Sequence, residues 1–260
     1  MLKVRNLSVS YDDNIVLNNF SLDMKKEEII TIVGESGSGK TTAIRAIMGL
    51  LPHKAKIISG EIILDDIDLT SISEDRWQKI RGSNIVSIFQ DSGAMLNPIR
   101  KIGSQFIEYL RAHAHYSKEE AYKISVHMLG SVNLENPQRI MKSYPFELSG
   151  GMKQRIAIAM AMSFRPKLLI ADEPTSALDV TTQKQIVTQM LKQRKIHKTS
   201  ILMVTHNLGV AGYMSDKIIV MNKGEIVEIG TPSEILKNPK HSYTKQLLSS
   251  IPDTEVGEYV

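Results

Sequence analysis

The sequence predicts an α/β protein with a parallel sheet, an antiparallel β subdomain and an inserted helical subdomain. Three observations lead to this prediction. Short apolar runs at residues 29–33, 168–171 and 200–204 are typical of strands that are buried on both faces. The first 24 residues instead alternate apolar and polar side chains, as half-buried antiparallel strands do. From residue 97 to about residue 164 the strand pattern stops and apolar residues recur at helical spacing.

The chain opens with an antiparallel hairpin. Residues 3–11 and 16–24 both alternate, and the polar turn Asp12-Asp13-Asn14 separates them. Tyr11 stands at the end of the first strand. Its ring either offers a face on which a base stacks or belongs to the core or the turn, and the local sequence leaves these interpretations open.

A glycine loop, Gly34 to Thr41, follows the apolar run 29–33 and opens a helix. Its spacing is G-x-x-x-x-G-K-[ST], in which glycines let the backbone curl so that its N–H groups surround phosphate oxygens. Lys40 can reach the β- and γ-phosphates, and the Thr41 hydroxyl can ligate magnesium. We therefore predict a nucleoside-triphosphate site built from Gly34, Glu35, Ser36, Gly37, Ser38, Gly39, Lys40, Thr41 and Thr42.

Polar side chains end three further strands. Asp172 and Glu173 follow the run 168–171, and because side chains alternate along a strand they point in different directions. One can hold magnesium while the other polarises water. Gln90 ends a buried strand and can reach the metal or the attacking water. His206 follows residues 200–205, at the carboxyl end of a strand, where open α/β sheets bind ligands.

A second anion-binding geometry closes the helical subdomain. In the segment Leu148 to Met152, which the resemblance described below identifies as the signature segment, Ser149, Gly150 and Gly151 offer a hydroxyl and bare N–H groups at a helix N-terminus. Taken alone, such a segment is an ordinary helix cap.

Further helix starts and one hairpin follow from local chemistry. Capping boxes occur at residues 71–74, before a helix with the only tryptophan, Trp77, and at residues 117–120 and 231–234. Asn136-Pro137 and Asp179 mark two more helix starts, a hairpin turns at residues 222–224, and a last helix covers roughly residues 241–249. His113, His115 and His127 lack clustered cysteine or carboxylate partners, so we interpret them as surface histidines rather than metal ligands.

The composition narrows the class of protein. The chain has no cysteine, which excludes disulfides and thiolate metal sites and fits a reducing compartment. It lacks a signal-peptide core at Met1 and any apolar run of the ~20 residues that a membrane helix needs. The net charge is +4, but the 32 basic residues form no tract, which favours a solvated surface over a nucleic-acid or membrane patch.

The order of these motifs resembles that of the ATP-binding subunit of an ABC transporter over residues 1–260. The resemblance implies a single ATPase domain with a helical subdomain at about residues 97–164 and a helical tail at about residues 231–260. It also implies an antiparallel subdomain built from the first strands and the final hairpin. One departure is Met152, where the family most often has Gln, but this position lies beyond the residues that would contact phosphate.

The resemblance also implies roles for the motif residues. The mechanism is in-line attack of water on the γ-phosphate of ATP, with Mg²⁺, Lys40 and backbone N–H groups stabilising the transition state. The implied catalytic residues are Glu173 as general base, His206 as switch histidine, Lys40 and Gln90, and the implied Mg²⁺ ligands are Thr41, Gln90 and Asp172. Tyr11 would stack on adenine, and residues 176–179 would form the D-loop. The residues of the signature segment that would contact nucleotide are Ser149, Gly150 and Gly151.

The implied assembly is a head-to-tail dimer of cassettes in which each signature segment closes the other cassette's ATP. The expected partners are two transmembrane permease subunits, a second, paralogous ATP-binding subunit, and an extracellular solute-binding protein. The chain would then lie peripherally on the cytoplasmic face of the membrane, and the helical insertion that follows Gln90 would receive the permease's coupling helix. The alternative is a soluble ABC-type ATPase that acts on nucleic acid or ribosomes. Such proteins typically carry a coiled-coil insertion or two cassettes, and this chain has neither, so we expect no nucleic-acid partner.

Three segments, residues 89–98, 144–152 and 238–252, look like the peptide/nickel importer branch of that family. Many peptide importers carry a cysteine cluster in a longer tail. Because this chain has no cysteine and stops at Val260, the resemblance places nickel or a metal–metallophore complex slightly ahead of di- or oligopeptides as the cargo.

Overall fold

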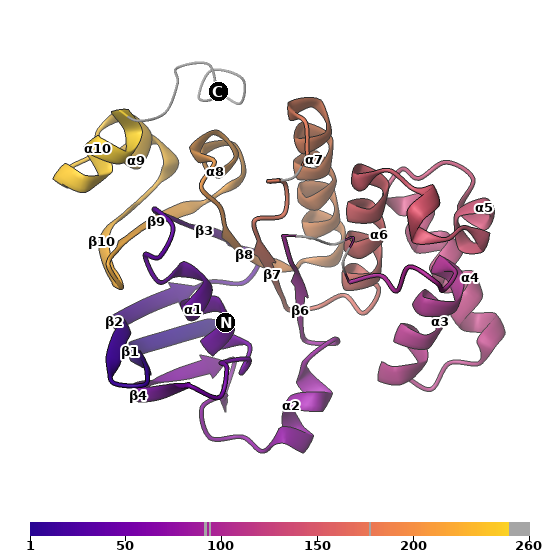
Figure 1. Ribbon diagram of the computed structural model, residues 1–260, viewed down its shortest axis with the longest axis horizontal. Helices are drawn as coiled ribbons and strands as arrows, with labels where there is room; N and C mark the ends of the chain where they lie inside the picture. The colour runs from indigo at the N-terminus through magenta and orange to yellow at the C-terminus, as the bar shows by residue number, and fades with distance from the viewer. Residues whose placement is uncertain (91–92, 94, 177, 250–260) are drawn as a thin grey trace. The chain divides into compact units, whose positions relative to one another are not determined.

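The computed structural model describes residues 1–90, 93, 95–176 and 178–249 (Figure 1). The chain forms two compact units. Unit 1 contains residues 1–78 and the chain from residue 200 onward, and unit 2 contains residues 79–199. Each unit carries one part of the predicted site.

An antiparallel sheet in unit 1 has the strand order β2-β1-β4-β5. It confirms the predicted hairpin, because Tyr11 pairs with Asn14 across the turn. One face of β1 is buried, including Leu2, Val4 and Val9, as the alternation predicted. The strands are β1 (Leu2–Tyr11), β2 (Asn14–Met24), β4 (Ala55–Leu64) and β5 (Ile67–Asp68).

A second sheet in unit 1 carries the glycine loop. Its central strand β3 pairs in parallel with β8 on one side and β9 on the other, and β10 pairs antiparallel with β9. Every residue of β3 and β8 is buried, which agrees with strands covered on both faces. The strands are β3 (Ile29–Val33), β8 (Ser200–Val204), β9 (Lys217–Asn222) and β10 (Glu225–Gly230).

The final hairpin lies in a different sheet from the one expected. We expected β9 and β10 to belong to the antiparallel subdomain, but β9 joins the parallel sheet beside β3. The physical reason is that Ile218 to Met221 are all buried, which suits a strand inside a sheet covered on both faces. As a result, the hairpin turn lies beside the glycine loop.

Helices also pack on the sheets of unit 1, and α9 and α10 lie next to β10 (Figure 1). The capping box predicted at residues 231–234 is present, since Thr231 and Glu234 bond reciprocally at the start of α9. The helices are α1 (Lys40–Ile47), α8 (Leu208–Met214), α9 (Pro232–Lys237) and α10 (Ser242–Ser249).

The helix that contains Trp77, α2 (Glu74–Ile80), begins later than its capping box predicted. The N–H groups of Arg76 and Trp77 both donate to the carbonyl of Ser73, so Ser73 rather than Ser71 precedes the helix. The Ser71 hydroxyl instead donates to the Asp68 carbonyl at 3.4 Å. Ser71 is therefore part of the preceding turn.

Unit 2 combines a parallel strand pair with the predicted helices. Strand β6 pairs with β7, and the helical region between them matches the predicted insertion. Ser117 and Asp179 cap their helices as predicted, and Asn136-Pro137 starts a third helix. The elements are β6 (Ile85–Ile88), α3 (Ile102–His113), α4 (Lys118–Ser131), α5 (Pro137–Lys142), the 3₁₀ turn η1 (Pro145–Glu147), α6 (Gly150–Met162), β7 (Leu168–Asp172) and α7 (Val180–His197).

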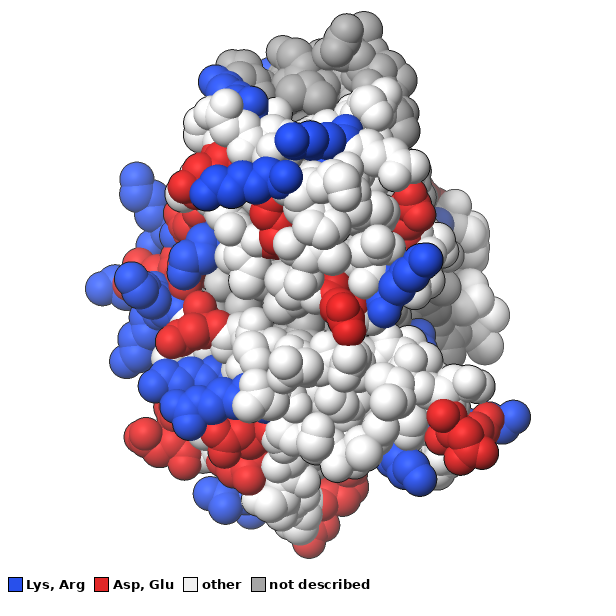
Figure 2. All heavy atoms as spheres, turned by 90° about the vertical axis from the view of Figure 1, so that its left-hand side faces the viewer, with Lys and Arg blue, Asp and Glu red and all other residues white. Residues whose placement is uncertain are grey.

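Charged side chains of both signs are intermingled on the face drawn in Figure 2, with uncharged side chains between them. This arrangement is typical of an ordinary solvated surface. Among the residues with described placement, no helix has the length and apolar character needed to span a membrane.

Candidate functional site

The glycine loop connects β3 to α1 through backbone conformations that favour glycine. Gly34, Gly37 and Gly39 have φ values of 149°, 81° and 98°, and Gly39 is the N-cap of α1. A Cβ atom on Gly37 would meet nothing within 4 Å, so the loop is open at this residue. The loop therefore has both the curled backbone and the space that a phosphate group needs.

The β9–β10 hairpin packs directly against the glycine loop. A Cβ atom on Gly34 would lie 2.2 Å from the backbone oxygen of Met221, so no larger residue fits there. The N–H of Gly224, in the hairpin turn, donates to the Ser38 carbonyl at 3.1 Å. Sequence reasoning identified the hairpin but not this contact, because nothing local in the turn indicates its distant partner.

Lys40 lies over the loop and is 8% exposed. Its ammonium group donates to the carbonyls of Gly34 at 2.8 Å and Glu35 at 2.7 Å, and lies 3.4 Å from the Ser38 hydroxyl. These are acceptors from the loop itself. The buried cation, the N–H groups and the neighbouring Thr41 hydroxyl match the chemistry of a bound phosphate with its metal ion.

His206 follows β8, which is the neighbour of β3 in the sheet. Its position is set by the residues on either side of it. The Thr205 N–H donates to the Ile32 carbonyl at 3.2 Å, and the Asn207 side chain caps α8 by accepting from the Val210 N–H at 2.9 Å. The exposed His206 is therefore held at the same sheet edge as the glycine loop.

Tyr11 is half-buried and pairs with Asn14 and Ala55. It belongs to the antiparallel sheet rather than to the sheet that carries the glycine loop. Its proposed stacking on adenine remains a prediction.

Unit 2 carries the carboxylate part of the predicted site. Because β6 and β7 are parallel, with Ile88 opposite Ala171, their carboxyl ends lie at the same edge. Gln90 comes shortly after β6, Asp172 is the last residue of β7, and Glu173 follows it. Gln90 is exposed, and both carboxylates are half-buried. The structure therefore brings together the three polar groups that the strand pattern predicted in this unit.

Glu173 has a φ of 48°, in the left-handed region that non-glycine residues rarely adopt. The next turn holds it there, since the Ser176 hydroxyl donates to the Glu173 carbonyl at 3.2 Å. Non-glycine backbone strain of this kind costs about 1–3 kcal/mol and clusters at functional sites. Glu173 therefore stands at a sharp turn that redirects the chain directly after β7.

Gln183 supports the D-loop, residues 176–179. Its side-chain amide donates to the carbonyls of Thr175 at 3.0 Å and Leu178 at 3.1 Å. Sequence reasoning missed this residue, since a glutamine in the first turns of a helix carries no distinctive signal. Of the D-loop itself, Ala177 lies outside the described residues.

The signature segment opens α6. The Ser149 hydroxyl caps the helix by accepting from the Met152 N–H at 3.3 Å, and Gly150 and Gly151 follow as the first helical residues. A Cβ atom on Gly151 would lie 2.7 Å from the Thr182 methyl group, so α6 needs glycine here to approach the start of α7. Both Ser149 and Gly150 are exposed.

Asp179 fixes the start of α7 beside that contact. Its carboxylate accepts from the Thr182 hydroxyl at 2.7 Å and from the Thr182 N–H at 3.0 Å. These two hydrogen bonds lower the pKa of Asp179. The cap therefore stays ionised, which suits the positive end of the helix dipole.

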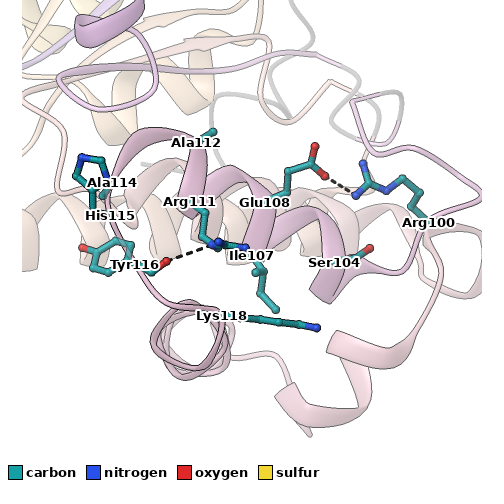
Figure 3. Close-up of a pocket in the computed structure, with 10 residues that line it drawn as sticks. All are labelled: Arg100, Ser104, Ile107, Glu108, Arg111, Ala112, Ala114, His115, Tyr116 and Lys118. Carbon is teal, nitrogen blue, oxygen red and sulfur yellow. Dashed lines mark hydrogen bonds and ion pairs between the residues drawn. The ribbon is translucent and has the colours of Figure 1, made fainter.

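A pocket of about 570 Å³ lies along α3 and the segment that joins it to α4 (Figure 3). Arg100 and Glu108 form an ion pair on its wall, and the Arg111 guanidinium donates to the Tyr116 carbonyl at 3.2 Å. Its lining is Arg100, Ser104, Ile107, Glu108, Arg111, Ala112, Ala114, His115, Tyr116 and Lys118.

The histidines of the helical region are exposed. The His113 ring lies edge-on to Tyr109 and Phe164, with centroids 5.2 and 5.7 Å away. Within the described part of the chain, no three or more histidine or acidic side chains form a group that could hold a metal ion.

Comparisons with known proteins agree with these motifs. A family model described as "ABC transporter" matches residues 17–176, and one described as "Oligopeptide/dipeptide transporter, C-terminal region" matches residues 227–258. Over 98% of its length the chain is 45% identical to the "Oligopeptide transport ATP-binding protein OppD" of Bacillus subtilis (strain 168), of which it covers 73%. Over 99% of its length it is 43% identical to the "Dipeptide transport ATP-binding protein DppD" of the same organism, of which it covers 78%.

One similar solved structure is an ATP-binding cassette in a dimeric, post-hydrolysis state bound to ADP and Pi. It has a TM-score of 0.78 and 31% sequence identity to this chain. The match covers 89% of this chain and 99% of the cassette.

Proposed function

Because the chain belongs to the ABC transporter ATPase family, we propose that it is the ATP-hydrolysing subunit of an importer of di- or oligopeptides. The observation that carries the cargo class is the peptide-transporter C-terminal region at residues 227–258. The similar proteins from Bacillus subtilis transport oligopeptides or dipeptides, according to their names. These similarities favour peptides over the nickel or metallophore cargo that the resemblance placed first. None of these similarities supports nickel import, which is therefore the alternative that the uptake experiment below tests.

In this proposal, hydrolysis uses both parts of the site. The glycine loop and Lys40 bind the β- and γ-phosphates of ATP, and the loop N–H groups stabilise the charge that develops during phosphoryl transfer. Glu173 accepts a proton from the attacking water. His206 and Gln90 respond to the γ-phosphate, as the switch histidine and Q-loop residue of the family do.

Magnesium would be held by Thr41, Asp172 and Gln90. A hydroxyl, a carboxylate and an amide oxygen form the all-oxygen donor set that Mg²⁺ prefers. When bound, the ion supplies Lewis-acid stabilisation of negative charge on the phosphates. Tyr11 is proposed to stack on the adenine ring.

The working unit is proposed to be a head-to-tail dimer of cassettes. The exposed Ser149 and Gly150 have a helix N-terminus suited to an anion. In a dimer, each signature segment would contact the γ-phosphate bound by the other cassette. The dimeric state of the similar cassette supports a dimer as the working unit. The second cassette is proposed to be a paralogue.

The remaining partners are two permease subunits and an extracellular solute-binding protein. The chain would lie peripherally on the cytoplasmic face of the membrane. We propose that the helical region of about residues 97–148 receives the permease's coupling helix, and that Gln90 links this contact to the γ-phosphate. The pocket along α3 supplies a surface with apolar and charged side chains for such a contact (Figure 3).

Replacing Gln90 with alanine is expected to uncouple transport from hydrolysis. ATP affinity should change by less than about threefold, because the glycine loop supplies most phosphate contacts, while peptide uptake per ATP hydrolysed should fall by about tenfold or more. The measurement is ATPase rate and peptide uptake in proteoliposomes of the whole transporter. Gln78→Ala, at another exposed glutamine, is the matched control. A parallel loss of ATP affinity and uptake in Gln90→Ala would contradict the coupling role.

The cargo is tested by uptake in a strain that lacks this chain. We expect the strain to lose uptake of labelled di- or oligopeptides and to recover it on complementation. Uptake of labelled nickel and cobalt, measured with and without a chelator, should stay normal. Lost metal uptake together with normal peptide uptake would instead establish the metal-chelate alternative.

A further inference from the structure

Tyr243, on α10, hydrogen-bonds to the glycine loop. The N–H of Glu35 donates to the Tyr243 hydroxyl at 3.1 Å, across 208 positions in the sequence. The Tyr243 side chain is only 9% exposed, so little water competes for this bond. Tyr243 lies within residues 227–258, the region that the peptide-transporter C-terminal family model matches.

The Tyr243 ring is fixed in an apolar cluster of unit 1. This cluster includes Val33, the residue that directly precedes the glycine loop. The other buried members come from α8, β9 and α9: Leu208, Ala211, Ile218, Val220 and Ile235. A rigidly packed ring therefore holds its hydroxyl at the point where β3 becomes the loop.

The start of α10 is also fixed by hydrogen bonds. The Glu228 carboxylate, on β10, accepts from the N–H groups of Lys240 at 2.7 Å and His241 at 3.1 Å. The Tyr243 N–H in turn donates to the His241 ring at 3.2 Å. The backbone of Tyr243 is thus fixed by hydrogen bonds and its ring by apolar packing, independently of the bond between its hydroxyl and the loop.

Glu35 is the residue on which Tyr243 and Lys40 converge. Its N–H donates to Tyr243, and its carbonyl accepts from the Lys40 ammonium at 2.7 Å. Phosphate oxygens would compete with that carbonyl for Lys40 when a nucleotide binds. The hydrogen bond from the Glu35 N–H to Tyr243 would keep the loop in place while the Lys40 ammonium exchanges the Glu35 carbonyl for a phosphate oxygen.

We infer that Tyr243 is a positioning residue for the glycine loop, which makes α10 part of the nucleotide-binding machinery. This inference rests on the proposed role of the loop as the ATP site. Tyr243 itself is not placed in contact with the nucleotide. A tyrosine that only filled the core would need its ring, whereas a positioning tyrosine also needs its hydroxyl.

Tyr243→Phe separates these two roles because it keeps the ring and removes the hydroxyl. We expect the KM for ATP and the Kd for a fluorescent ATP analogue to rise by about three- to tenfold, the factor that one hydrogen bond contributes. The kcat at saturating ATP should change by less than about twofold, because the lost interaction is made equally in the ground and transition states. Tyr122→Phe, at an exposed tyrosine on α4, is the matched control and should leave both constants unchanged.

The folded fraction of each variant is measured by thermal unfolding before the kinetics. If folded Tyr243→Phe keeps the wild-type KM and Kd, or loses kcat with an unchanged KM, the inference is overturned. Lys40→Ala in the same binding assay distinguishes this outcome from failure of the proposed function. Wild-type ATP affinity in Lys40→Ala would show that the loop is not the nucleotide site. Weakened binding in Lys40→Ala with wild-type behaviour in Tyr243→Phe would overturn the inference about Tyr243 alone.

Discussion

Glu173→Gln is expected to lower ATP turnover by about a hundredfold or more, which corresponds to roughly 3 kcal/mol of barrier, while ATP binding persists. Glutamine has nearly the same shape as glutamate but cannot accept the proton of the attacking water. Glu173 follows β7 in a left-handed conformation that Ser176 supports, so the substituted side chain should occupy the same place. The measurement is phosphate release at saturating ATP, together with the Kd of a fluorescent ATP analogue.

Glu135→Gln is the matched control for this variant. Glu135 is an exposed glutamate in the same unit, and its replacement makes the same change of charge. It should leave turnover within about twofold of wild type, as surface substitutions away from sites usually do. Wild-type turnover in Glu173→Gln would show that another group acts as the base.

The second large effect is a change of oligomeric state. Glu173→Gln should be mainly monomeric without nucleotide and dimeric with ATP, because hydrolysis no longer removes the γ-phosphate that both cassettes contact. If the partner is an obligatory paralogue, the same shift should appear in an equimolar mixture of the two proteins. Light scattering coupled to size-exclusion chromatography measures the mass in each state.

Ser149→Arg in the Glu173→Gln background should abolish the ATP-dependent dimer. A bulky side chain would block the exposed N-terminus of α6, where the other cassette's nucleotide is proposed to bind. Ser117→Arg is a matched control, since Ser117 caps α4 in the same way and each lost cap costs about 1 kcal/mol. Robust hydrolysis by a demonstrably monomeric protein would contradict the dimer.

Features set by short-range chemistry could be predicted from the sequence. The glycine loop stands between β3 and α1 as expected, because apolar runs, glycines and a helix start are all local signals. The caps at Ser117, Asp179 and Thr231 are local for the same reason. Ser71 is the exception among the boxes. The N–H groups of Arg76 and Trp77 donate to the Ser73 carbonyl, so the helix starts after Ser73 instead, and Ser71 stays in the preceding turn, where its hydroxyl donates to the Asp68 carbonyl.

Features set by long-range pairing could not be predicted in this way. The apolar run of β9 is compatible with either sheet, and its partner β3 lies far away in the sequence. The supports of the site, Gly224 and Tyr243 beside the glycine loop, depend on the same distant contacts. Gln183 is close in sequence to the D-loop, but only the turn geometry shows that its side-chain amide donates hydrogen bonds to two backbone carbonyls.

Peptide uptake by the strain that lacks this chain, complemented with either wild type or Glu173→Gln, tests most directly whether ATP hydrolysis at this site powers import. With equal amounts of protein in the membrane, wild type should restore uptake of labelled peptide. Glu173→Gln should leave uptake at the level of the uncomplemented strain. Full restoration of peptide uptake by Glu173→Gln would contradict the account, because transport would then proceed without the proposed base.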